Sequence, residues 1–120
     1  MEEILAIMPS QRIIAEDLGH ITSSVKKMIK HYKLKGMRVL QFGYGNGTRN
    51  EHHHTNIDKN TVCYVGTHDN NTAKGWFKEM KLKEQTTNFQ RLIKEFEIEE
   101  SNCSKKMIDI GMNTDSKYFV

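Results

Sequence analysis

Short apolar runs alternate along the chain with amphipathic segments, and polar residues or glycines separate them. Runs at residues 12–16, 37–42 and 61–66, and the start of a fourth at 116–120, lack a clean apolar–polar alternation. Such runs are typical of strands that are buried on both faces of a parallel sheet. The sequence therefore predicts an α/β fold, organised as one structural unit across residues 1–120.

The segments between these runs have apolar residues at helical spacing. The clearest stripe is Phe89, Leu92, Ile93 and Phe96, which predicts a helix over residues 85–98 with this face in the core. Two further helices are predicted over residues 2–8 and 105–111. Another is capped by Thr22 or Ser23 and stopped by Gly36, and its apolar face consists of Val25, Met28, Ile29 and Tyr32. The last is capped by Asn70 or Asn71 and runs to Met80.

Two of the apolar runs lead directly to a carboxylate. Glu16 ends the run IIAE, and Asp69 follows VCYVGTH. Active sites of α/β barrels lie at the C-terminal ends of the strands. Paired carboxylates are the groups that act on glycosidic bonds. Acidic residues at two strand ends therefore predict a barrel-type site that acts on sugars.

Three segments together resemble the 4-α-glucanotransferases, the amylomaltase or disproportionating-enzyme family of glycoside hydrolase family 77. They are IIAEDLG at 13–19, GMRVLQF at 36–42, and GTHDNNT at 66–72 with Gly75-Trp76 after it. The resemblance covers nearly the whole chain and implies a (β/α)8 TIM barrel. A complete barrel takes about 250 residues, so we expect a partial one, from about the fifth strand to the eighth with their helices.

The resemblance also implies retaining transfer of α-1,4-glucan segments from a glucan donor to a glucan acceptor. Glu16 would be the general acid/base, and Asp69 the carboxylate that binds donor-sugar hydroxyls and stabilises the transition state. His68 resembles the family histidine that binds the same sugar, and Asn70 is a substrate-binding candidate beside it. Phe42 is a candidate wall of a sugar subsite, with packing inside the barrel as the alternative.

The chain departs from the family at the nucleophile. In the family, an Asp at the end of the fourth strand attacks the anomeric carbon, and residues 1–120 do not include that strand. Asp17 is no substitute for it, because neighbouring side chains on a strand point to opposite faces; we expect Asp17 to cap or pair locally. The 120 residues alone are therefore predicted to be inactive or nearly so.

A second interpretation is a non-catalytic barrel remnant. It would bind glucan weakly or complement a separate N-terminal half. Half a barrel has two open sheet edges and an uncovered interior, so self-association is also expected.

The long loop at residues 43–60 also departs from the family. HHTN at 53–56 replaces a stretch similar to Leu-Pro-His-Asn, and Asn71 stands where an Asp is common. The run His52-His53-His54 is interpreted mainly as loop drift, because consecutive loop residues rarely converge on one ion. Zinc is the minor alternative, and no metal or cofactor is expected.

The net charge is +3, from 18 Lys and Arg against 15 Asp and Glu spread along the chain. This pattern indicates a solvated surface and no nucleic-acid partner. No apolar run approaches the roughly 20 residues of a membrane span, and the acidic start MEEIL is unlike a signal peptide. Two distant cysteines, Cys63 and Cys103, favour a reducing, cytoplasmic location. The hydrophobic fraction of 37% is low for a free-standing domain and predicts many exposed faces.

Overall fold

The computed structural model describes residues 1–45 and 49–120, and its centre is a parallel sheet. The strands, in sheet order, are β1 (Gly36–Val39), β2 (Thr61–Tyr64) and β3 (Tyr118–Phe119). A parallel bridge between Ile14 and Lys35 adds the first apolar run beside the start of β1. Every strand pairing in this sheet is parallel, so the predicted α/β class with a parallel sheet is confirmed.

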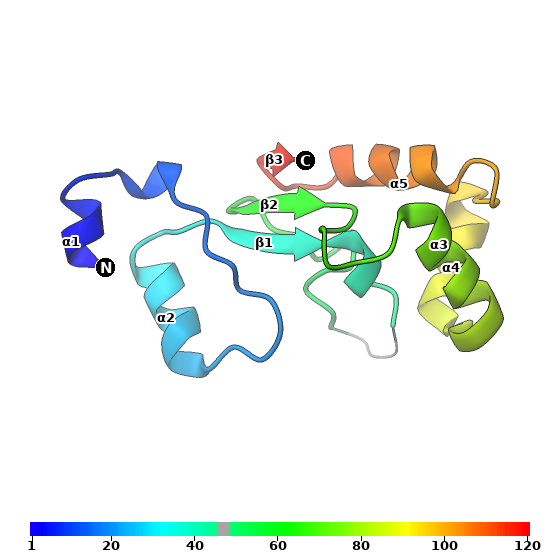
Figure 1. Cartoon of the computed structure of the whole chain (residues 1–120), viewed down its shortest axis with the longest axis horizontal. Helices are drawn as coiled ribbons and strands as arrows, with labels where there is room; N and C mark the ends of the chain where they lie inside the picture. The colour runs from blue at the N-terminus through cyan, green and yellow to red at the C-terminus, as the bar shows by residue number, and fades with distance from the viewer. Residues whose placement is uncertain (46–48) are drawn as a thin grey trace.

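Helices lie at both ends of this sheet. They are α1 (Glu2–Leu5), α2 (Ser23–His31), α3 (Ala73–Glu79), α4 (Thr87–Phe96) and α5 (Cys103–Met112), with 3-10 turns at Ser10–Arg12 and Leu40–Phe42 and a π-helical turn at Met80–Glu84. Figure 1 shows α3, α4 and α5 gathered at the end toward which β1 and β2 point, and α1 and α2 at the other end. The molecule is elongated, with extents of 48 × 25 × 23 Å. No helix in the described part of the chain is long and apolar enough to cross a bilayer.

The first apolar run forms less strand than predicted. Arg12 belongs to a 3-10 turn, only Ile14 makes a bridge, and its side chain is 49% exposed rather than buried. The bond that this run donates to the sheet goes to Lys35: Ala15 N–H donates to the Lys35 carbonyl over 2.7 Å. The second run is also shorter than predicted, because the backbone turns into a 3-10 helix directly after Val39.

Several helix boundaries differ from their predictions, and α1 ends at Leu5 rather than at residue 8. Thr72, and not Asn70 or Asn71, caps α3 by accepting from Gly75 N–H over 3.1 Å. α2 begins at its predicted cap, Thr22, but it ends at His31, well before Gly36. Lys33 then takes a left-handed conformation with φ +54°, which ends the helical path.

The hydrophobic core lies between the sheet and the helices α3, α4 and α5. Phe89 is completely buried, and its ring contacts those of Trp76 and Phe77 at centroid distances of 5.6 and 5.5 Å. Leu92 is buried as well, while Ile93 and Phe96 pack against the core from its edge. The predicted apolar stripe of α4 is therefore confirmed.

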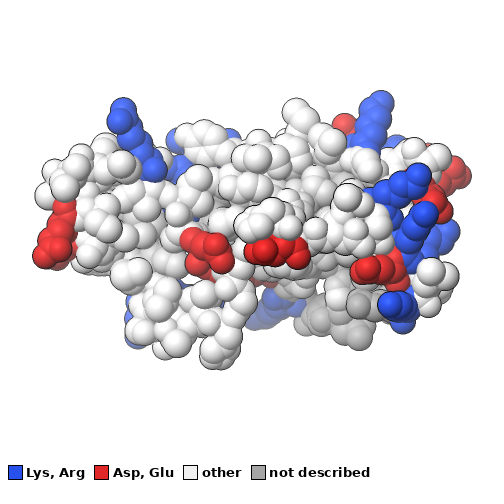
Figure 2. Space-filling model, viewed as in Figure 1, with Lys and Arg blue, Asp and Glu red and all other residues white. Residues whose placement is uncertain are grey.

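The other end of the molecule has little core of its own. α2 contains no buried residue, and Val25 and Met28 on its apolar face are each 37% exposed. Figure 2 shows acidic and basic side chains interspersed at the end formed by α3 and α4, whereas the middle of this face carries few charges. The charge on this face follows the predicted pattern of a solvated surface.

Replacing Phe89 by Ala should destabilise the fold by about 3–5 kcal/mol, since the substitution empties a filled aromatic site. The measurement is the free energy of unfolding in urea. Ile7→Ala is the matched control, because Ile7 is 88% exposed and its loss should change stability by less than about 0.5 kcal/mol. Equal effects of the two substitutions would contradict this location of the core.

Candidate active site

Each of the two predicted catalytic carboxylates comes on the C-terminal side of a segment that pairs in the parallel sheet. Glu16 comes two residues after the Ile14 bridge, and Asp69 comes in the turn that follows β2. β1 lies between these two segments, because it pairs with β2 and continues from Lys35. Both carboxylates are exposed to solvent. The parallel pairing thus places both acids after segments that run in the same direction, although the acids are 53 positions apart in the chain.

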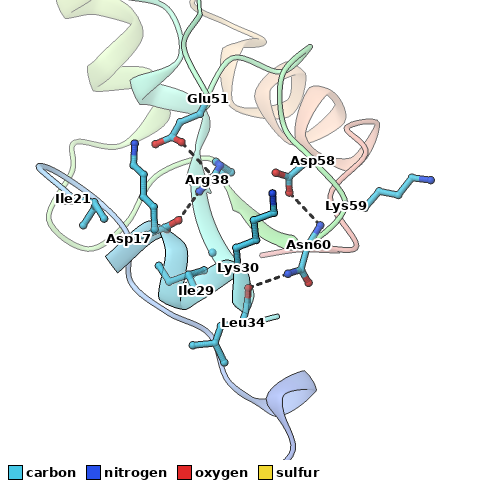
Figure 3. A pocket seen from close by; sticks show the side chains of 12 residues that line it. Asp17, Ile21, Ile29, Lys30, Leu34, Arg38, Glu51, Asp58, Lys59 and Asn60 are labelled. Atoms are coloured by element: carbon cyan, nitrogen blue, oxygen red, sulfur yellow. Dashed lines mark hydrogen bonds and ion pairs between the residues drawn. The ribbon is translucent and has the colours of Figure 1, made fainter. Parts of the chain in front are cut away.

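Asp17 faces β1 and is held there by several bonds. Its Oδ1 accepts from Met37 N–H over 2.7 Å, and its Oδ2 accepts from Arg38 Nη1 over 2.9 Å. The Asp17 and Arg38 side chains are only 12% and 11% exposed. Arg38 Nη2 also lies 3.7 Å from Glu51 Oε2 in the following loop (Figure 3). The prediction that Asp17 pairs locally is confirmed.

The turn after β2 presents His68 and Asp69 to solvent. Asn70 closes this turn, since its Oδ1 accepts from both the N–H and the hydroxyl of Thr67, over 2.9 and 2.8 Å. His68 Nε2 lies 3.2 Å from Asp69 Oδ1, and the two side chains are 90% and 81% exposed. The sequence-predicted trio is therefore contiguous and accessible, and Asn70 also has a role in shaping the turn.

Gln41, which is not among the predicted site residues, supports this turn from the 3-10 turn that follows β1. Its side chain is buried and donates from Nε2 to the Asn71 carbonyl over 3.0 Å. Its backbone N–H donates to the Val65 carbonyl over 3.1 Å. Gly66 leaves room for it, because a Cβ there would lie 2.6 Å from Gln41 Nε2. The sequence feature that could have indicated this role is the polar Gln41 inside the apolar run at residues 37–42.

Phe42 lies at the surface beside the same edge. Its ring is 40% exposed and meets the ring of His52 edge-on, at a centroid distance of 5.4 Å. Its carbonyl accepts from Asn50 Nδ2 over 2.7 Å. In this structure Phe42 is therefore available to a ligand rather than packed in the hydrophobic core.

Each of the three consecutive histidines makes a hydrogen bond, His52 to β1 and His53 and His54 within the loop. His52 Nδ1 accepts from Val39 N–H over 3.0 Å, His53 Nδ1 accepts from Thr55 N–H over 3.2 Å, and His54 Nδ1 lies 2.9 Å from the Tyr44 hydroxyl. Burial lowers the pKa of all three imidazoles. Among residues 1–45 and 49–120, no group of three or more His, Cys, Asp or Glu side chains is arranged to bind a metal ion. The histidines hold the loop together, and zinc gains no support from their geometry.

Comparison with known proteins identifies the family. The profile described as 4-alpha-glucanotransferase matches residues 2–120. The chloroplastic/amyloplastic 4-alpha-glucanotransferase of Solanum tuberosum is 38% identical over 108 residues, which are 90% of this chain and 18% of the relative. The chain belongs to the 4-alpha-glucanotransferase family. A second relative, the 4-alpha-glucanotransferase of Aquifex aeolicus, is 29% identical over 99% of this chain and 24% of its own length.

The fold agrees with this assignment to the 4-alpha-glucanotransferases. An amylomaltase from Streptococcus agalactiae, solved in complex with acarbose, superposes with a TM-score of 0.79 at 22% identity. The match covers 98% of this chain and 24% of the amylomaltase. The chain thus spans about a fifth of the length of these three proteins. The family resemblance expected from residues 13–19, 36–42 and 66–72 is confirmed.

Acidification should weaken this 4-alpha-glucanotransferase fold at the histidine loop. A protonated His52 Nδ1 can no longer accept from Val39 N–H. Burial lowers the pKa of His52 from its ordinary value of 6.5, so the unfolded chain binds the proton more readily. The stabilisation is therefore complete above about pH 6.5 and is lost as the pH falls through the folded-state pKa.

The measurement is the urea midpoint at a series of pH values between 7.5 and 5. His52→Asn offers an acceptor oxygen that does not titrate, so the slope of stability against pH should become shallower. His20→Asn, at an exposed loop position, is the control and should leave the slope unchanged. An unchanged slope in His52→Asn would show that the Val39–His52 bond does not carry the effect.

Proposed function

We propose that these residues form part of the catalytic (β/α)8 barrel of a 4-alpha-glucanotransferase, from about its fifth to its eighth strand. In that site Glu16 is the general acid/base and Asp69 is the carboxylate that stabilises the donor sugar. The observation that supports this most is that each acid follows a segment of one parallel sheet and that these segments run in the same direction, since barrel enzymes place their catalytic groups after their strands. Membership of the 4-alpha-glucanotransferase family supplies the reaction.

The proposed reaction is a double displacement on an α-1,4-glucan. The Glu16 carboxylic acid gives its proton to the glycosidic oxygen while a carboxylate nucleophile outside these 120 residues attacks the anomeric carbon, so the glycosidic C–O bond breaks as a glycosyl-enzyme bond forms. The Glu16 carboxylate then takes the proton of an acceptor glucan hydroxyl. That hydroxyl oxygen attacks the anomeric carbon and releases the nucleophile, and the anomeric configuration is retained.

The neighbouring residues are proposed to bind the sugar. The exposed Asp69 carboxylate can accept hydrogen bonds from sugar hydroxyls, with His68 beside it. Asn70 Oδ1 is engaged with Thr67, so its Nδ2 group is the donor available to a hydroxyl. Phe42 offers an exposed ring face for a sugar. The amylomaltase that shares this fold was solved with acarbose, which supports a glucan as donor and as acceptor.

We place the protein in a reducing compartment, the cytoplasm. Cys63 and Cys103 are both buried and unpaired with each other. Burial raises the pKa of the Cys63 thiol to about 11, so this thiol stays protonated and unreactive at neutral pH.

The activity test compares the 120 residues alone with the same residues in a complete enzyme. Alone, they should form no longer maltooligosaccharides from maltotriose, because double displacement needs the absent nucleophile. Residues 2–120 placed in the Aquifex aeolicus relative, instead of its aligned segment, should restore transfer. In this chimera Glu16→Gln should lower turnover by about 10²–10⁴-fold, the usual contribution of acid/base catalysis. Asp69→Asn should also lower turnover strongly.

Asp115→Asn is the control, because it removes an exposed carboxylate in the segment before β3. Transfer by the 120 residues alone would contradict the need for an outside nucleophile. Full turnover in Glu16→Gln would remove Glu16 from its proposed role.

A second candidate function is association with another polypeptide, favoured by the apolar surface at the N-terminal end. Ile4, Ile7 and Ile14 are 52%, 88% and 49% exposed, and α2 has no buried residue. Surfaces of this kind are covered when a partner binds. We propose that a complementary N-terminal barrel half covers them, and that a second copy of the chain does so where that half is absent.

Sedimentation velocity of the pure chain over a range of micromolar concentrations tests this proposal. We expect the average mass to rise with concentration, and Ile7→Asp with Ile14→Asp to reduce that rise by introducing charge. Leu82→Asp is the control, since Leu82 is an 83%-exposed apolar residue in the π-helical turn between α3 and α4. A stable monomer at every concentration would contradict association.

A further inference from the structure

Glu16 has little support from the sheet itself. The segment before it is paired with β1 through two backbone bonds, Ala15 N–H to the Lys35 carbonyl at 2.7 Å and Lys35 N–H to the Ile13 carbonyl at 3.4 Å. The segment forms a single bridge rather than a strand, and Glu16 is exposed. A group that orients Glu16 must therefore act from beyond this bridge.

The next residue, Asp17, supplies such a hold. Its two carboxylate oxygens bind different parts of β1, Met37 N–H and Arg38 Nη1, so the carboxylate can neither rotate nor shift without breaking a bond. Arg38 Nη1 also donates to the Met37 carbonyl over 2.7 Å, which fixes the guanidinium in turn. Gly36 is required at its position, because a Cβ there would collide with Asp17 Oδ2.

This ion pair forms one wall of a cavity of about 700 Å³ between α2 and β1. Figure 3 shows Asp17 and Arg38 pointing toward each other, with Glu51 on the far side of the guanidinium. Through Glu51, Arg38 reaches the loop that contains His52, whose ring contacts Phe42. One guanidinium therefore connects the segment after Glu16 with the loop beside the proposed sugar subsite.

We propose that the Asp17–Arg38 pair positions Glu16, by fixing which way the chain faces just after the Ile14–Lys35 bridge. Successive side chains on an extended segment point to opposite sides, so an Asp17 bound to the cavity side directs Glu16 the other way. This proposal rests on the acid/base role of Glu16 given above. Asp17 and Arg38 act through Glu16 and touch no substrate themselves.

The test uses the full 120-residue chain, labelled with ¹⁵N and ¹³C, and measures the backbone order parameter at Glu16 by NMR. In the unmodified chain we expect about 0.85, the value of rigid backbone, and below 0.6 in the variants. Asp17→Asn keeps an oxygen for Met37 N–H but turns an amide toward the guanidinium. Arg38→Gln removes the guanidinium. Arg38→Lys should be intermediate, because a single ammonium cannot bind Asp17 and Glu51 with the fork geometry of Arg.

Lys78→Gln is the matched control. It removes the Lys78–Glu100 ion pair of 3.1 Å, whose side chains are about half exposed, and it should leave the order at Glu16 unchanged. The residues of β2 report on the fold as a whole. Order lost at Glu16 while β2 keeps its order supports positioning. Three results would overturn it. The order could fall equally at Glu16 and in β2, Glu16 could stay as rigid in Asp17→Asn and Arg38→Gln as in the unmodified chain, or Glu16 could already be mobile in the unmodified chain.

A second measurement separates this proposal from the proposed function. Acarbose is added, and the ¹³C signal of the Glu16 carboxyl group is followed. We expect acarbose to shift this signal in the unmodified chain and to shift it at least several-fold less in Asp17→Asn. The shift should be larger in Arg38→Lys than in Arg38→Gln. These results would support a Glu16 that is positioned for glucan. An unchanged signal in the unmodified chain counts against glucan binding at Glu16, and the order parameters then decide the positioning role by themselves.

Discussion

Parallel backbone pairing is the constraint on which the rest of this structure depends. The bridge from Ile14 to Lys35, the register of Gly36 with Thr61 and that of Val62 with Tyr118 all run in one direction. Parallel strands need crossover connections, and their carboxyl ends all lie at the same edge. Glu16 and Asp69 therefore follow segments that run in the same direction, Glu16 beside the start of β1 and Asp69 beyond the end of β2. A slip of one residue in the register would turn the side chains of a strand to its other face.

The paired strands are short, so polar side chains continue the connection where backbone pairing stops. Gln41 joins the end of β1 to the turn after β2, and Asn70 closes that turn. Asp17 and Arg38 join the first segment to β1. Among the described residues, no buried side-chain nitrogen or oxygen is without a hydrogen-bond partner. Because leaving such a group unpaired is costly, each of these bonds also specifies one loop geometry over its alternatives.

The parts of the fold that were predicted from the sequence are those set by local periodicity. The stripe of α4 fixes its buried face whatever its neighbours are, and the apolar runs near β1 and β2 indicate parallel strands. The prediction of a buried strand at residues 12–16 was wrong, because the length of a strand depends on its pairing partners, which periodicity does not reveal. The prediction of the α3 cap was wrong because Asn70, Asn71 and Thr72 are all residues that cap helices well. In the structure the Asn70 side chain is already hydrogen-bonded to Thr67, and Thr72 caps the helix. Gln41 was missed because its role exists only once two distant segments meet.

The two proposed carboxylates differ in how firmly the chain holds them. The turn that carries Asp69 adjoins α3, whose Trp76 and Phe77 belong to the buried core. Gln41 Nε2 also holds this turn, by donating to the Asn71 carbonyl. Glu16 lies near the end formed by α1 and α2, which contain no buried residue. Its segment is held by a bridge, the Asp17–Arg38 ion pair and the Asp17–Met37 hydrogen bond. Acid/base chemistry depends on the distance to the proton that is moved. The position of the catalytic groups is therefore less firmly fixed on the Glu16 side, where polar contacts hold the chain, than on the Asp69 side, where hydrophobic packing supports it.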